Sequence, residues 1–118
     1  MPAGRLSTHV LDLTRGRPAT GVRVDLFRLE PGDGDVRQPV VSVRTNADGR
    51  TDAPLLSGDT FATGTFELVF HVGDYFGEDA VNRFLDQVPV RFAIGDPAGH
   101  YHVPLLVTPW AYQTYRGS

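Results

Sequence analysis

The sequence predicts an antiparallel β-sandwich of seven or eight short strands with one short helix. Runs rich in β-branched and aromatic residues recur along the chain, and clusters of Gly, Pro and Asp separate them. A single segment has apolar residues at the four-residue spacing of a helix face. The 118 residues suit one domain, and no repeat, linker or low-complexity tract interrupts them. We therefore expect a single domain over residues 1–118.

Three predicted strands lie in the first half of the chain. In the second of them Val22, Val24 and Leu26 alternate with polar or aromatic residues, and this period of two is typical of a half-buried strand. The Asp48–Gly49 pair follows the third strand and is of the kind that supplies a positive φ in a tight turn. The three strands are expected at residues 6–13, 22–29 and 39–45, with turn-rich stretches at 14–21 and 30–35.

The second half is predicted to hold the helix and the remaining strands. Phe76, Ala80 and Phe84 recur at four-residue spacing, so we expect a short helix that ends before Pro89. A looser stretch reaches Thr65 before the strand-like sequence FELVFHV begins. The final strands form a hairpin around the turn Thr-Pro-Trp. These strands are expected at residues 66–72, 88–94, 101–107 and 111–116.

Composition excludes several kinds of chemistry and several partners. The chain contains no cysteine and no lysine, which removes disulfides, thiolate nucleophiles and Schiff-base chemistry. The formal net charge of −3 argues against a nucleic-acid partner. No apolar run approaches the roughly 20 residues that span a bilayer, so no membrane association is expected. The N-terminal residues show no signal-peptide pattern, and we expect a cytoplasmic protein.

Histidines are the main candidates for chemistry. His100 and His102 are two residues apart, so on a regular strand both project from one face. Zinc could use this pair with His9 as a third ligand, or the pair could be structural and the strand residue His9 could face solvent. His71 ends an apolar run, and we expect it at a solvent-exposed strand end. Arg50 follows the Asp-Gly turn, where arginines are usually solvated. None of these residues alone establishes an enzyme.

Together, four segments of the chain resemble one family. The segments LSTHVLDLTRGRPATGV, RTNADGR, FLDQVPVRFAI and HYHVPLLVTPWAYQTYRGS are similar to those of 5-hydroxyisourate hydrolases, the bacterial branch of the transthyretin fold. The resemblance runs from Leu6 to Ser118. The ending Tyr-Arg-Gly-Ser is its most discriminating part. Transthyretin itself, the hormone carrier, resembles this family in fold but lacks that ending and the catalytic histidines.

The resemblance implies a reaction and a set of site residues. Family members open the ring of 5-hydroxyisourate with water at the N1–C6 bond and yield 2-oxo-4-hydroxy-4-carboxy-5-ureidoimidazoline, a step of urate degradation in purine catabolism. It also implies a transthyretin-like sandwich, no cofactor or metal, and a homotetramer with sites at the dimer–dimer interface. The implied catalytic residues are His9, Arg50 and His102, and the implied substrate-binding residues are Tyr115, Arg116 and Ser118.

The residue types suggest how such a site would work. Arg50 carries a planar, permanent charge that can attract an anionic ring and stabilise charge on its oxygen. A histidine titrates near neutrality and can take a proton from water, and the residues leave open whether His102 or His9 does so. Two other functions remain as alternatives. One is a non-enzymatic transthyretin-like carrier of a small ligand, and the other is a metal-binding sandwich that uses His9, His100 and His102.

Overall fold

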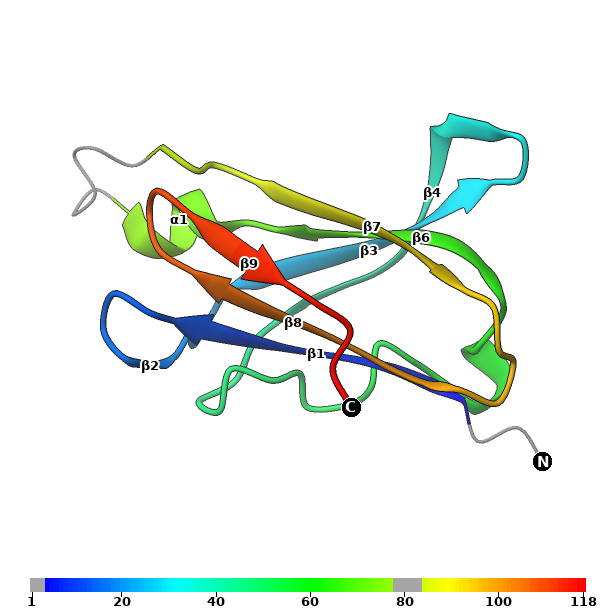
Figure 1. Ribbon diagram of the computed structural model, residues 1–118, viewed down its shortest axis with the longest axis horizontal. Helices are drawn as coiled ribbons and strands as arrows, with labels where there is room; N and C mark the ends of the chain where they lie inside the picture. Colours follow the sequence, from blue (N-terminus) through cyan, green and yellow to red (C-terminus); the bar gives the residue numbers. More distant parts are fainter. Residues whose placement is uncertain (1–3, 78–83) are drawn as a thin grey trace.

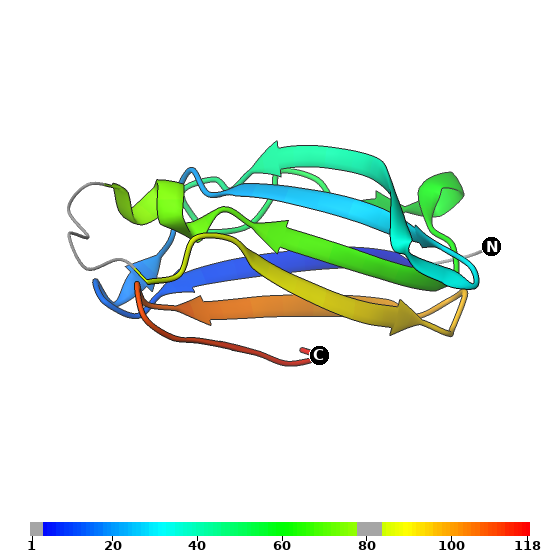
Figure 2. The same ribbon diagram turned by 90° about the horizontal axis from the view of Figure 1, so that it is seen from above.

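Two β-sheets stack face to face in the computed structural model, which describes residues 4–77 and 84–118. Figure 2 shows the two layers from the side. The first sheet has the order β2-β1-β8-β9, with β5 also paired to β1, and the second has the order β4-β3-β6-β7. The strands of the first sheet are β1 (Arg5–Asp12), β2 (Arg17–Pro18), β5 (Leu56–Ser57), β8 (His100–Val107) and β9 (Tyr112–Thr114). Those of the second are β3 (Arg23–Glu30), β4 (Asp33–Arg44), β6 (Gly64–Phe70) and β7 (Val88–Ile94).

The predicted sandwich is confirmed, but one strand pair differs from the prediction. β1 and β8 run parallel, whereas every other pair of strands described here is antiparallel. A parallel pair needs a long connection, and here the chain passes through the whole second sheet between the two strands. The parallel register sets Ser7 beside His102 and His9 beside Pro104.

The helix prediction is only partly correct. The helix α1 (Val72–Phe76) starts earlier than expected and ends at Gly77, whose φ of 64° is a left-handed conformation that glycine adopts without strain. Phe84 lies outside any helix and is exposed, and Ala80 falls outside the described residues. A 3₁₀ turn, η1 (Gly58–Thr60), lies in the loose stretch before β6.

The core lies between the sheets and is built by alternation along each strand. In β1 the inward residues are buried, whereas Ser7, His9 and Leu11 are partly exposed on the outer face. The second sheet therefore covers only one face of the first sheet, and the outer face is left for other contacts. The largest fully buried side chains include Leu6, Val24, Leu26, Phe66, Leu68, Phe70 and Leu105.

The expectation that His71 faces solvent is wrong. Only 9% of His71 is exposed, and its Nε2 lies 2.8 Å from Oδ2 of Asp25, which is itself buried. Ser42 donates to the other oxygen of this carboxylate at 2.6 Å, and Arg23 donates to the same oxygen at 3.0 Å. His71 is therefore a structural residue, since a buried carboxylate needs such donors.

The C-terminal tail continues β9 along β8 (Figure 1). The strands pair Leu105 with Thr114, and three residues further along each strand a bridge pairs His102 with Gly117. The ladder is interrupted between these points because Pro104 has no N–H to donate. Instead, the Thr114 hydroxyl donates to the Pro104 carbonyl at 2.7 Å. The tail is thus held in strand register up to Gly117.

Candidate active site

Three polar side chains meet on the outer face of the first sheet. Ser7 and His9 project from β1, and His102 projects from β8 beside Ser7. The Ser7 hydroxyl lies 2.8 Å from Nδ1 of His102. His100 shares this face, as the spacing of the two histidines predicts, while Tyr101 is buried on the other side. The parallel pairing of β1 and β8 brings these residues together from opposite ends of the chain.

The turn after β4 places Arg50 next to His9. The side-chain oxygen of Asn46 accepts hydrogen bonds from the backbone N–H groups of Asp48 at 2.9 Å and Arg50 at 3.2 Å. Gly49 has a φ of 75°, and a Cβ there would lie 2.4 Å from the Val10 carbonyl oxygen, so only glycine lets the turn approach β1. The predicted Asp-Gly turn is confirmed, and it forms a bridge between His9 and Arg50.

A hydrogen bond from this turn determines which nitrogen of His9 carries a proton. Nε2 of His9 lies 2.8 Å from the carbonyl oxygen of Asp48. A carbonyl oxygen can only accept, so Nε2 must donate. When His9 is neutral, its Nδ1 therefore presents a lone pair.

The charges of this site act on His102. Partial burial lowers the pKa of His102 below its ordinary value, and the positive charges of Arg50 and His9 lower it further. His102 is therefore neutral at pH 7, which is the state that a general base requires. Arg50 is exposed, as expected for an arginine after a turn. Its charge acts on His102.

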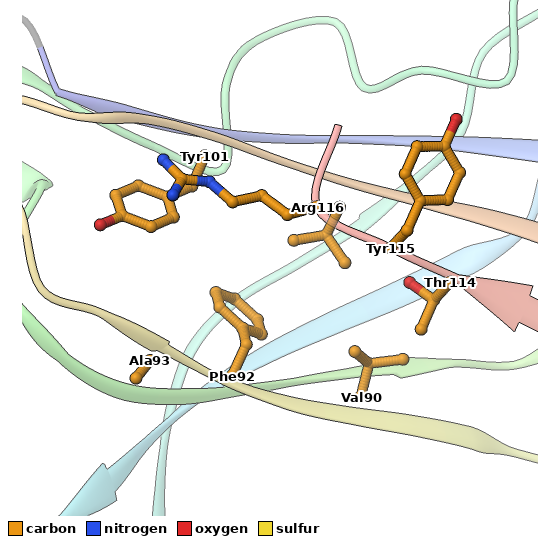
Figure 3. A pocket seen from close by; sticks show the side chains of 8 residues that line it. Val90, Phe92, Ala93, Tyr101, Thr114, Tyr115 and Arg116 are labelled. Carbon is orange, nitrogen blue, oxygen red and sulfur yellow. The ribbon is translucent and has the colours of Figure 1, made fainter. Parts of the chain in front are cut away.

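The tail reaches the same site through Gly117. The Gly117 N–H donates to the His102 carbonyl at 2.7 Å, and Ser118 is the next residue. In this register Tyr115 stands opposite Pro104, on the face that carries the histidines. Arg116 takes the other side: its guanidinium stacks on the Tyr101 ring, 4.2 Å from the centroid (Figure 3). Arg116 thus lies apart from His9, Arg50 and His102.

Two pockets flank the tail and the turn. One of about 230 Å³ lies beside the histidine site and is lined by Arg5, Ser7 and Arg50, among others. The other, of about 310 Å³, lies between the open edges of the two sheets and is mainly apolar, with Phe92 and Tyr101 in its wall (Figure 3). The smaller pocket is the candidate for chemistry, because its wall includes Arg50 and also Ser7, which contacts His102.

Sequence reasoning missed Ser7 and the role of Asn46. Ser7 stands two residues before His9 on the same strand face, and this spacing was a usable signal. Asn46 gives no such signal, because its part in the turn depends on the local backbone.

Within residues 4–77 and 84–118 no group of three or more His, Asp or Glu residues is placed to hold a metal ion. No helix in that same part of the chain is long and apolar enough to cross a membrane.

Comparison with known proteins gives concordant results. The model of the HIUase/Transthyretin family matches residues 6–117. The chain is 57% identical to 5-hydroxyisourate hydrolase 2 of Rhizobium meliloti (strain 1021), over 98% of both chains. It is 33% identical to the solved structure of Klebsiella pneumoniae 5-hydroxyisourate hydrolase, with a TM-score of 0.79 and coverage of 98% of this chain and 94% of the other. Transthyretin from Sparus aurata shares the fold, with a TM-score of 0.86, 23% identity and coverage of 96% of both chains.

Proposed function

The chain belongs to the HIUase/Transthyretin family, and from this premise we propose that it hydrolyses 5-hydroxyisourate at the site formed by His9, Arg50 and His102. It is an enzyme, a hydrolase that acts on a cyclic amide C–N bond. The product is 2-oxo-4-hydroxy-4-carboxy-5-ureidoimidazoline, on the route of urate degradation. The observation that carries the proposal is that His9, Arg50 and His102 come together at the outer face of the first sheet: a bridge pairs His9 with Arg50, and the charge of Arg50 acts on His102.

The proposed mechanism uses these three side chains directly. His102 takes a proton from water as the water oxygen attacks C6, because its lowered pKa leaves it unprotonated at neutral pH. Arg50 stabilises the negative charge that develops on the C6 oxygen. The N1–C6 bond then breaks, and the leaving nitrogen accepts a proton. His9, whose Nε2–H is bound to the turn, orients the water through Nδ1 when it is neutral or supplies that proton from Nδ1 when it is protonated.

The tail residues are proposed to bind the substrate. Ser118 follows the residue that contacts His102, and Tyr115 stands on the same sheet face. Arg116 is proposed to serve binding in a different way, because its guanidinium lies on Tyr101 and donates to the His100 carbonyl at 3.4 Å. It holds the tail against β8 so that its neighbours reach the substrate.

We also propose a homotetramer with the sites between subunits at the dimer–dimer interface. The second sheet does not cover the outer sheet face that carries the histidines, and the pocket beside this face has only about 230 Å³. Large side chains next to this face are exposed, among them Leu13 and Tyr115. Light scattering at micromolar concentration should give about four times the chain mass of 12.9 kDa. A fully active monomer would contradict the interfacial site.

The assay that tests the function generates 5-hydroxyisourate in place. Urate oxidase produces the compound, and its ultraviolet absorbance is followed with and without this protein. A decay that the protein does not accelerate would rule out the hydrolase and leave a small-ligand carrier as the better explanation. The proposed location is the cytoplasm, which fractionation of the source cells tests.

A further inference from the structure

Two residues hold the imidazole of His102 from opposite sides. On the β1 side, the Ser7 hydroxyl lies 2.8 Å from Nδ1. On the tail side, Gly117 lies so close that a Cβ on it would be 2.6 Å from Cδ2 of the ring. Nδ1 and Cδ2 are the two ring atoms next to Cγ. The outer end of the ring, which bears Nε2, therefore points away from the sheet. Among the described residues, none forms a hydrogen bond with that nitrogen.

The hydrogen bond between Ser7 and His102 allows two proton arrangements. The hydroxyl can accept from Nδ1–H, which leaves a lone pair on Nε2, or it can donate to Nδ1, which places the proton on Nε2. Nε2 is the ring nitrogen that points out from the sheet, so a base that acts on water needs its lone pair there. When His102 acts as that base, its proton lies on Nδ1 and the Ser7 hydroxyl accepts it.

From this geometry we infer that Ser7 is a positioning residue, whose hydroxyl accepts the Nδ1 proton of His102 and so keeps Nε2 free to act on water. The inference rests on the proposed hydrolase function, and it adds a residue to the site. Serine is suited to this position because its hydroxyl can accept a hydrogen bond without adding charge. Ser7 also lines the pocket that contains Arg50, so the residue that contacts the base is part of the same cavity wall as the cation.

A rival role for Ser7 uses the same contact. If the hydroxyl donated to Nδ1, His102 could activate Ser7 as a nucleophile, and a covalent intermediate would form on its oxygen. The two roles differ in the tautomer of His102 and in the consequence of removing the hydroxyl. Loss of a residue that orients a metal-bound histidine costs about ten- to a hundredfold in activity, and we expect a loss of that size for a residue that only orients His102. Loss of a nucleophile costs on the order of a millionfold.

The decisive experiment reads the tautomer without using activity. Protein with ¹⁵N-labelled histidine is studied by two-bond ¹H–¹⁵N NMR at a pH where His102 is neutral, and the His102 signals are assigned with a His102→Asn variant. We expect the proton on Nδ1 in the wild type and a mixture of tautomers in Ser7→Ala. Ser7→Thr keeps the hydroxyl and should keep the wild-type pattern. The control is Ser57→Ala, because Ser57 is exposed and bonds Thr60 through its backbone nitrogen and oxygen.

Kinetics of the same variants complete the test. Ser7→Ala should lose about ten- to a hundredfold in kcat, Ser7→Thr should recover most of it, and Ser57→Ala should match the wild type. A proton on Nε2 in the wild type, or a Ser7→Ala variant with unchanged kcat, would overturn the inference. A substrate adduct on Ser7, found by mass spectrometry after acid quench, would also overturn it and make Ser7 the nucleophile. An inactive wild type with the proton on Nδ1 would instead reject the proposed function and leave the positioning contact intact.

Discussion

Gly117 packs directly against the imidazole of His102. Its N–H donates to the His102 carbonyl at 2.7 Å, and a Cβ at this position would come within 2.6 Å of the ring. Real Cβ atoms do not approach another heavy atom so closely, so a larger residue would have to move either the tail or the ring. The third residue of the Tyr-Arg-Gly-Ser ending is therefore determined by the space that His102 leaves.

Gly117→Ala should impair catalysis without unfolding the protein. The added methyl group displaces His102 or the tail, and a misplacement of about 1 Å can cost on the order of a hundredfold in rate. We expect a loss of that size in kcat/KM, measured by the coupled urate oxidase assay. The matched control is Gly95→Ala, because a Cβ there meets nothing within 4 Å. Equal activity of the two variants would show that the contact has no role in catalysis.

Deletion of residues 116–118 should abolish most activity and leave a folded sandwich. These residues contribute no buried apolar side chain to the core, whereas Gly117 contacts His102 and Arg116 stacks on Tyr101. Activity and thermal unfolding should be measured on the same preparation. The hypothesis fails if the truncated protein is well folded and turns over substrate at nearly the wild-type rate.

Arg50→Lys should lose at least about a hundredfold in catalytic efficiency. Lysine keeps the positive charge but lacks the planar donor fork of arginine. Removal of one donor to a developing oxyanion typically costs roughly a hundred- to a thousandfold. The measurement is kcat/KM at neutral pH. Retained efficiency in Arg50→Lys would mean that charge alone, without directed hydrogen bonds, accounts for the role of Arg50.

The pH–rate profile should report the protonation of His102. A general base works when it is deprotonated, so kcat/KM rises as the pH passes through the pKa of the base. The pKa of His102 is lowered, so the acidic limb of the profile should lie below the ordinary histidine value of 6.5. Arg50→Gln removes a cation and should move the limb upward, whereas Arg50→Lys should leave it in place.

His102→Asn should remove the acidic limb and cost at least about a hundredfold in efficiency, the lower end of the range for loss of a general base. If the limb persists in His102→Asn, His9 is the base and His102 has another role. The folded state of this variant is verified by its circular dichroism spectrum and thermal unfolding.

His71→Asn should destabilise the protein and leave the chemistry almost unchanged. Burial raises the pKa of Asp25, but hydrogen bonds from Ser42, His71 and Arg23 outweigh it, so the folded pKa is lowered. The contribution of Asp25 to the free energy of unfolding is therefore fully present above the unfolded pKa of about 3.8. It is lost as the pH falls through the lower pKa of the folded state.

Loss of one donor to this buried carboxylate should cost about 1–3 kcal/mol of unfolding free energy, measured in urea at neutral pH. His100→Asn, at an exposed position, is the stability control. The role assigned to His71 is wrong if both variants unfold at the same urea concentration. It is also wrong if the kcat of His71→Asn falls as far as that of His102→Asn.

Local sequence pattern was enough to predict the strand faces, the Asp-Gly turn and the ordered C-terminal tail of this protein. The period of two placed His100 and His102 on one face and buried Tyr101 between them, because alternation is a property of the strand itself. The Asp-Gly turn formed as expected, since a positive φ at Gly49 is a local requirement. The Tyr-Arg-Gly-Ser ending indicated a tail with a specified position, and the register with β8 accounts for that position.

Only the tertiary structure decided which of these faces meet. His71 pairs with Asp25 from 46 residues away, and Ser7 reaches His102 across 95 residues. No local period reports such distances, because strand adjacency depends on how the whole chain crosses between the sheets. The parallel pairing of β1 with β8 is such a choice. It converts a serine and two histidines, each ordinary in its own strand, into neighbours whose charges and hydrogen bonds act on one another.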